Sequence, residues 1–172
     1  MGRHSTIDES ALYSVIGRSM LENGTISMQN IIEKTGISSG SLYHRYKSRE
    51  GLLARTWFDA LDAFQDQFLK IMSSGEDNLG EEAALVTPRF CRQYHERALI
   101  LACCQSSQFL GSDTDKALLA ESQKRNADMA LQIKNFAKNS GISLDSCYLA
   151  IVHYPLAVVR HYLPERKVPV SA

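Results

Sequence analysis

The outer face of a short helix predicted over residues 38–46 carries small side chains and aromatic or imidazole side chains with a polar end. Side chains of this kind can enter the major groove of DNA and donate hydrogen bonds to bases and phosphates. Two cations, Lys47 and Arg49, follow at the predicted start of the next helix, where a cation and free amides can hold a phosphate together. We therefore take this face as a candidate DNA contact surface. Its members are Ser39, Gly40, Ser41, Tyr43 and His44.

Charge is distributed unevenly, although the 172-residue chain has 19 basic and 19 acidic residues and a formal net charge of +0. Residues 1–57 carry seven Lys and Arg against five Asp and Glu, whereas residues 58–172 carry twelve against fourteen. A local basic cluster is what a small DNA-reading module on a larger body shows. A solvated helix face would give the same pattern. The basic residues of segment 43–55 are Arg45, Lys47, Arg49 and Arg55, with His44 beside them.

Patterns for metal chemistry are incomplete. His95 and Glu96 begin a zinc-binding HExxH motif, but Leu99 occupies the place of the second histidine. Cys91 and His95 lie one helical turn apart without an evident third ligand. A buried thiol and a surface histidine explain that pair better than a metal site does.

The sequence offers no motif of an enzyme or of a cofactor site. It has no GxSxG elbow, no phosphate-binding loop and no carboxylate pair with a nucleophile. Cys103 and Cys104 could sense oxidants, but they lie in the most apolar predicted helix, where thiol reactivity falls, so core filling is favoured. The four cysteines form no CxxC pair, which indicates a reduced, cytoplasmic protein.

Local signals divide the chain into helices, and no strand pattern stands out. A capping box at Thr6 and Glu9 begins the first helix, and Ser27, Ser38 and Ser48 can cap the next three. The fourth helix is long and carries an apolar stripe to residue 72. Further helices are expected over residues 81–94, 96–107, 115–139 and 143–162.

Prolines and the C-terminal residues set further expectations. Pro88 should kink or break the helix over residues 81–94, and Pro155 should kink the last helix. Residues 165–172 are read as a loose tail. The longest apolar run covers only residues 98–104, far short of the roughly 20 residues of a membrane helix. We therefore expect no membrane association.

Residues 37–53 resemble the TetR family of bacterial transcriptional regulators, in which such a run spans the recognition helix and the start of helix four. Two positions depart from the family pattern. Ser39 stands where many members carry a lysine or arginine, and Gly51 stands where an acidic residue is common, which should weaken the first turn of that helix slightly. The direct matches are Gly36, Ile37, Ser38, Gly40, Ser41, Leu42, Tyr43, Ser48, Glu50, Leu52 and Leu53.

The resemblance implies an all-α fold with two domains. A three-helix DNA-binding domain with a helix-turn-helix is expected over residues 1–47, and a helical ligand-binding and dimerisation domain over residues 48–164. It further implies a homodimeric repressor that a small molecule releases from double-stranded operator DNA. Tyr43 and Arg49 match the family's phosphate-contacting pair, although Tyr43 could instead only pack between helices one and three. The implied DNA-binding residues are Ser38, Ser39, Gly40, Ser41, Tyr43, His44, Lys47 and Arg49.

The predicted body contains an aromatic set that suits either a solid helical core or an effector cavity. Few cations accompany this set, which suggests a mainly apolar effector. The candidate pocket residues are Trp57, Phe64, Phe68, Phe90, Tyr94, Phe109 and Met129.

The last predicted helix has two apolar faces, and a monomer can cover only one of them. A homodimer would cover the second. The candidate interface residues are Tyr148, Val152, Leu156, Val159 and Tyr162.

Two other classes of function compete with a DNA-binding repressor. One is a small helical enzyme, which would show turnover. The other is a dimerisation module whose helix-turn-helix binds protein, which would lack the salt dependence of phosphate binding.

Overall fold

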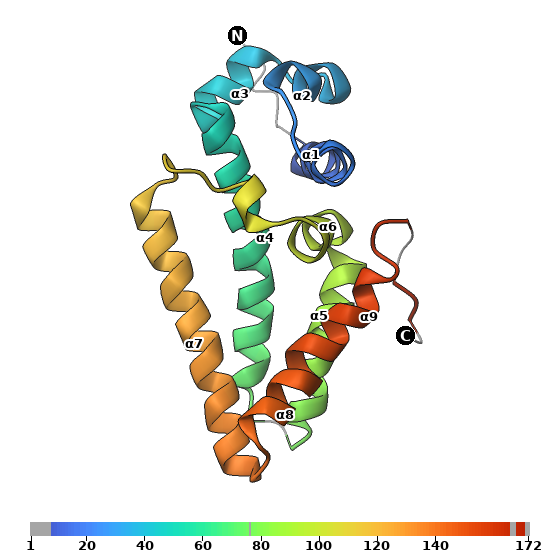
Figure 1. The fold of residues 1–172 in the computed structure, drawn as a ribbon, viewed down its shortest axis with the longest axis vertical. Coiled ribbons are helices and arrows are strands. Elements are labelled where there is room, and N and C mark those ends of the chain that lie inside the picture. Colours follow the sequence, from blue (N-terminus) through green and yellow to red (C-terminus); the bar gives the residue numbers. More distant parts are fainter. Residues whose placement is uncertain (1–7, 76, 166–167, 171–172) are drawn as a thin grey trace.

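Helices account for every regular element in the computed structural model, which describes residues 8–75, 77–165 and 168–170. The all-α prediction is therefore confirmed. Figure 1 shows two tiers, with the first three helices above a body through which α4 runs from top to bottom. The bounds are α1 (Glu9–Asn23), α2 (Met28–Thr35), α3 (Ser39–Tyr46), α4 (Arg49–Met72), α5 (Leu79–Gln93), α6 (His95–Cys103), α7 (Lys116–Ser140), α8 (Leu144–Tyr148) and α9 (Tyr154–Arg160).

Side-chain caps begin the helices of the upper tier, as the sequence predicts. The hydroxyl oxygens of Ser27, Ser38 and Ser48 each accept a hydrogen bond from a backbone N–H in the first turn of α2, α3 and α4. The first helix differs, because Asp8 is its N-cap and accepts from the amide of Ala11 at 3.1 Å. The predicted cap Thr6 lies outside the described residues.

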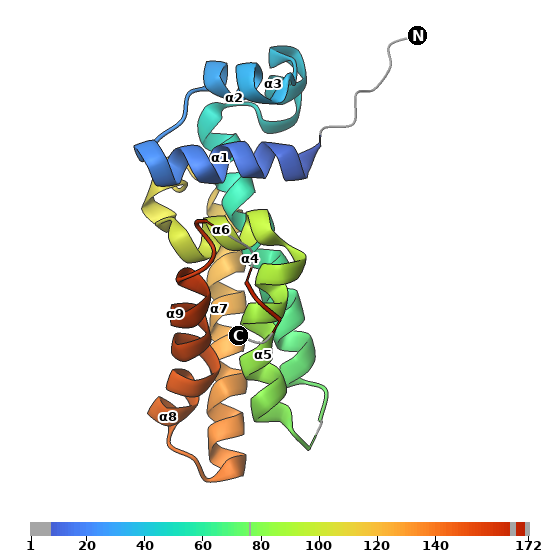
Figure 2. The same ribbon diagram turned by 90° about the vertical axis from the view of Figure 1, so that its right-hand side faces the viewer.

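The core of the upper tier includes residues from the body. Leu12 and Ile31 of the first two helices are fully buried together with Leu52 of α4 and Ile100 of α6. Figure 2 shows the reason, since α1 lies across the top of the body directly above α6. The upper tier is therefore packed onto α4 and α6 rather than joined to them by a linker.

In the body, α4 lies between α5 and α7 and is tied to α7 by polar side chains around one buried glutamine. Gln65 of α4 is fully buried and donates from Nε2 to Oδ1 of Asn126 at 2.7 Å. Arg125 of α7 donates from Nε to Oε1 of Gln65 at 2.9 Å and also pairs with Asp66. Because the buried amide of Gln65 has a partner for both its nitrogen and its oxygen, this network fixes the position of α7 on α4.

The fifth helix is expected to kink or break at Pro88, and the structure shows no break. The helix α5 runs unbroken from Leu79 to Gln93, with Pro88 buried inside it. Pro88 lines a space of about 280 Å³ together with Val159 of α9 and Val168.

The last predicted helix is continuous but changes its winding before Pro155. A π-helical turn, Leu149–His153, joins α8 to α9, and the amide of Tyr154 donates to the carbonyl of Leu149. Pro155 then occupies the second position of α9, directly after this π-helical turn. The predicted distortion takes the form of a wider turn.

The end of the sixth helix and the C-terminal tail differ from the predictions. The helix α6 ends at Cys103 rather than at residue 107, and the side chains of Gln105 and Gln108 cap the short 3₁₀ turn that follows. In the tail expected to be loose, Val168 is buried and the carbonyl of Pro169 accepts from Nη1 of Arg92 at 2.7 Å, whereas Val170 is exposed.

Candidate functional site

The helix α3 turns one face inward and the opposite face to solvent. Leu42 and Tyr46 are buried, whereas Tyr43 keeps 48% of its surface exposed. Its neighbours Gly40 and His44 are exposed as well. About half of the surface of Tyr43 is therefore open to solvent.

Two serines at the start of α3 bond to each other. The oxygen of Ser38 accepts from the amide of Ser41 at 3.2 Å, and its hydroxyl donates to the Ser41 oxygen at 2.9 Å. Ser39, between them, is exposed. The two bonded hydroxyls hold the first turn of α3, which leaves Ser39 and Gly40 at the accessible end of the helix.

Lys47 closes the C-terminal end of α3. It is the one non-glycine residue in the described ranges with a positive φ, 67°. Its amide donates to the carbonyl of Tyr43 at 3.0 Å, and its ammonium donates to the carbonyl of His44 at 2.8 Å. A cation at this end complements the negative end of the helix dipole.

Arg49 is bound to the loop between α1 and α2. Its Nε donates to the carbonyl of Ile26 at 2.6 Å, and its Nη2 donates to the hydroxyl oxygen of Thr25 at 2.8 Å. Its Nη1 lies 3.4 Å from a carboxylate oxygen of Glu50. Sequence reasoning matched Arg49 to a phosphate contact but missed Thr25 and Ile26, because no local pattern joins residues 23 positions apart. Arg49 holds α2 against the start of α4.

The absence of a side chain at Gly51 has a steric reason that the sequence did not reveal. A Cβ atom at this position would overlap the backbone oxygen of Tyr46, and the next contact would be the oxygen of Ser48 at 3.4 Å. The same Tyr46 oxygen accepts from the amide of Ser48 at 2.8 Å, which fixes it above the first turn of α4. Absence of a side chain at Gly51 allows α3 and α4 to approach this closely.

Ion pairs neutralise part of the basic segment 43–55. Arg45 pairs with Glu9 of α1, and Arg55 pairs with Asp59 at 2.7 Å. Asp59 also accepts a hydrogen bond from the hydroxyl of Tyr13 at 2.7 Å. These pairs bind α1 to α3 and α4, so part of the basic cluster has a structural role.

Three of the seven predicted pocket residues surround one apolar cavity of about 210 Å³. Trp57, Phe64 and Phe90 line it, with Phe64 and Phe90 edge to face at 5.4 Å. Sequence reasoning did not assign the remaining wall to the pocket, and that wall comes from α4, α5, α6 and the last helix. That wall includes Leu61, Thr87, Cys91, Ala98, Leu101, Ala102, Val152 and Leu156.

The other four predicted pocket residues lie outside this cavity. Phe68 is buried and packs on Phe64 with ring centres 6.2 Å apart, and Met129 packs in the same cluster. Phe109 packs on Trp57 at 5.4 Å in the core of the upper tier. Tyr94 packs on Phe90 but lines a separate, polar cavity.

The cysteine environments oppose thiolate chemistry. Burial raises the pKa of Cys91 to about 12 and that of Cys104 to about 11. Burial also raises the pKa of Cys103. Since the thiolate is the reactive form, these thiols act as small apolar side chains at neutral pH.

The candidate interface residues of the last helix are distributed between core and surface. Val159 is 1% exposed and belongs to the core beneath α9. Tyr148, Val152, Leu156 and Tyr162 are partly buried against the body. The large apolar side chains most exposed on this stretch are instead Leu149 at 58% and Tyr154 at 69%.

Comparison with protein families gives one match. Residues 24–56 match the model for bacterial regulatory proteins, tetR family, from the glycine that ends α1 to the second turn of α4. No curated protein and no solved structure matches the chain. In the described part of the chain, no helix is both long enough and apolar enough to span a membrane.

Proposed function

We propose that this chain, in which residues 24–56 match the model for bacterial regulatory proteins of the tetR family, is a DNA-binding transcriptional regulator. In this proposal it is a cytoplasmic, homodimeric repressor without enzymatic activity. A small, mainly apolar effector releases it from double-stranded operator DNA. The DNA-contacting residues are Ser38, Ser39, Gly40, Ser41, Tyr43, His44, Lys47 and Arg49.

The observation that carries the proposal is that one helix reaches both sites. The helix α4 begins at Arg49, beside the recognition helix α3, and contributes Trp57, Leu61 and Phe64 to the apolar cavity. An effector in the cavity therefore contacts the element on which α3 is fixed. Such an effector shifts the equilibrium only if it prefers the form that cannot bind DNA.

Within the DNA surface, the contacts divide into two kinds. Tyr43 contacts a phosphate through its hydroxyl, and Arg49 uses the N–H groups left after its bonds to Thr25 and Ile26. Such contacts set position, whereas Ser39 and His44 on the exposed face of α3 read base edges.

DNA binding is tested by selecting sites from a random double-stranded library and measuring affinity across salt concentrations. We expect a palindromic site whose log affinity falls with log salt by about 0.9 per phosphate contact. Binding without salt dependence would contradict DNA recognition and favour a helix-turn-helix that binds protein.

Effector release is tested on the complex with the selected site. Indole and toluene serve as small aromatic probes, and arabinose is the polar control. We expect the aromatic probes to lower operator affinity and arabinose to leave it unchanged. An operator affinity that is the same in the presence of each of the three compounds would contradict an apolar effector pocket of this size.

A further inference from the structure

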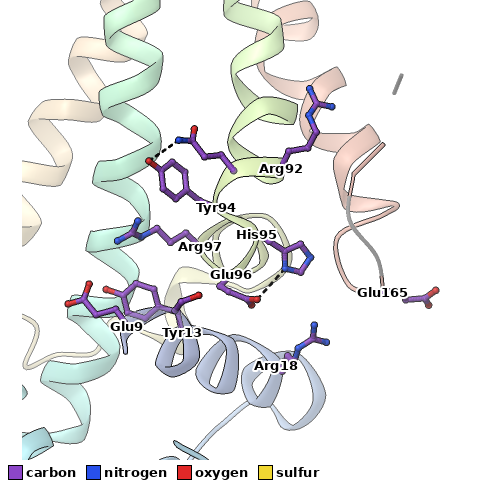
Figure 3. A pocket seen from close by; sticks show the side chains of 11 residues that line it. Glu9, Tyr13, Arg18, Arg92, Tyr94, His95, Glu96, Arg97 and Glu165 are labelled. Carbon is purple, nitrogen blue, oxygen red and sulfur yellow. Dashed lines mark hydrogen bonds and ion pairs between the residues drawn. The ribbon is translucent and has the colours of Figure 1, made fainter. Parts of the chain in front are cut away.

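A second cavity, unlike the first in chemistry, lies where the upper tier meets the body. It has a volume of about 620 Å³ and lies between α1 and the corner at which α5 passes into α6. Figure 3 shows its side chains around the N-terminal end of α6, which points at the viewer. Glu9, Tyr13 and Arg18 come from α1, and Glu165 from the chain after α9. None of its residues lines the apolar cavity.

Two adjacent residues that line this cavity, Glu96 and Arg97, each have one side-chain polar atom that is buried without a hydrogen-bond partner. These atoms are Nε of Arg97, a donor, and Oε2 of Glu96, an acceptor. Leaving a buried polar group unpaired costs about 1–3 kcal/mol, and more if it is charged, so such groups call for a partner. Two oppositely charged side chains that line one cavity are therefore incompletely paired.

The guanidinium of Arg97 is held by aromatic rings rather than by a carboxylate. It lies 5.6 Å from the ring centre of Tyr13 and 5.4 Å from that of Tyr94. Cation–π contacts of this kind orient the side chain and leave its N–H groups available. Figure 3 shows Arg97 extending to one side of the α6 end, between these two rings.

Charges on the other side of the α6 end are also incompletely paired. Arg18 has no carboxylate partner among the described residues and extends toward Glu96 and His95 in Figure 3. The other oxygen of Glu96 lies 3.6 Å from Nδ1 of His95, a contact that is an ion pair only when the imidazole is protonated. Glu96 thus remains an acceptor for a cationic or donating group.

The start of α6 adds donors between these two sides. Its N-cap residue, Tyr94, makes no side-chain cap, so the amides of the first turn receive no capping oxygen from it. Free amides and the positive end of the helix dipole favour an anionic group at this place.

We propose that this cavity binds a small zwitterion, a molecule of amino-acid to dipeptide size with separated carboxylate and ammonium groups. The carboxylate accepts from Arg97 and from the amides at the start of α6. The ammonium donates to the carboxylate of Glu96. A simple anion would leave Glu96 unpaired, and a simple cation would leave Arg97 unpaired.

The test uses ω-amino acids from glycine to 6-aminohexanoate, which vary the distance between the two charges. Titration calorimetry on the full chain measures their binding, with the carboxylate and the amine of equal chain length as matched controls. We expect one chain length to bind best, and both of its controls to bind at least tenfold more weakly. Glu96→Gln should lower the affinity for that amino acid at least tenfold, and Arg18→Gln should lower it by a smaller factor.

Lys124→Gln, on the exposed face of α7, is the matched control and should not change binding. Absence of binding by every member of the series would overturn the proposal, as would a carboxylate control that binds as tightly as its amino acid. Unchanged affinity in a folded Glu96→Gln variant would also overturn it. Operator binding by the same preparation separates this outcome from failure of the proposed function, because a chain that binds DNA is folded.

Discussion

At the scale of single residues, Arg49 has a structural role beside any contact with DNA. Two of its nitrogens bond to Thr25 and Ile26, in the loop before α2. Losing these bonds should lower the free energy of unfolding by about 1–3 kcal/mol. We therefore expect Arg49→Ala to weaken operator binding and to lower the melting temperature.

Arg49→Lys separates the two roles. Lysine keeps the positive charge but cannot make both bonds of the guanidinium. We expect the salt dependence of DNA binding to persist while chemical denaturation shows the loss of stability. A lysine variant as stable as the parent would show that the bonds to Thr25 and Ile26 contribute little.

Tyr43 supports a prediction about DNA alone. Its ring is half exposed, so removing the hydroxyl in Tyr43→Phe should leave stability unchanged. Loss of a hydrogen bond to a charged phosphate should weaken operator binding by about tenfold on all sequences. By contrast, His44→Ala should change the preferred base at one or two positions. Selection of sites by each variant distinguishes the two results.

Gly51 gives a prediction whose sign is the test. Helix propensity alone predicts that Gly51→Ala stabilises α4 by about 1 kcal/mol. The overlap with the Tyr46 oxygen predicts destabilisation instead, by about 1–3 kcal/mol. Gly40→Ala is the matched control, since a Cβ at Gly40 meets nothing within 4 Å. Thermal denaturation should show a lower melting temperature for the first variant and an equal or higher one for the second.

At the scale of helices, the sequence predicted the features that depend on residues close together in the chain, such as the helix caps. Ser27, Ser38 and Ser48 are caps because a hydroxyl reaches an amide three residues ahead. The effects of Pro88 and Pro155 were less predictable, because packing across α5 and α9 determines whether a helix tolerates a proline. Sequence likewise cannot show that Arg49 reaches Ile26, since that contact requires α2 and α4 to be already in place.

The side of α4 that borders the apolar cavity can be altered without disturbing the core. Phe64 borders the apolar cavity, so Phe64→Trp should fill part of it. We expect operator binding to remain and release by indole to be lost. Fluorescence anisotropy of labelled operator measures both.

Phe68→Trp is the comparison, because Phe68 is 1% exposed in solid core. Overpacking there should cost about 1–3 kcal/mol of stability. If Phe64→Trp destabilised the chain as much as Phe68→Trp, the region would be solid core and the effector pocket would lose its support.

At the scale of the whole molecule, the exposed apolar residues of the last helix predict self-association. Leu149 and Tyr154 are one π-helical turn apart and mostly exposed. Analytical ultracentrifugation at micromolar concentration should give a mass near twice the 19.2 kDa of the chain. The double variant Leu149→Glu, Tyr154→Glu should sediment as a monomer. A parent chain of about 19 kDa would contradict the homodimer.

The close contact of α3 with α4 at Gly51 makes the recognition helix an extension of a long rod. A helix of 24 residues is about 36 Å long at 1.5 Å per residue. A rotation of about 5° about its lower end would displace its upper end by about 3 Å, by the geometry of that length. Half-sites on DNA are spaced by about one helical turn, 34 Å, so two such displacements in opposite directions would place the recognition helices out of register with the groove.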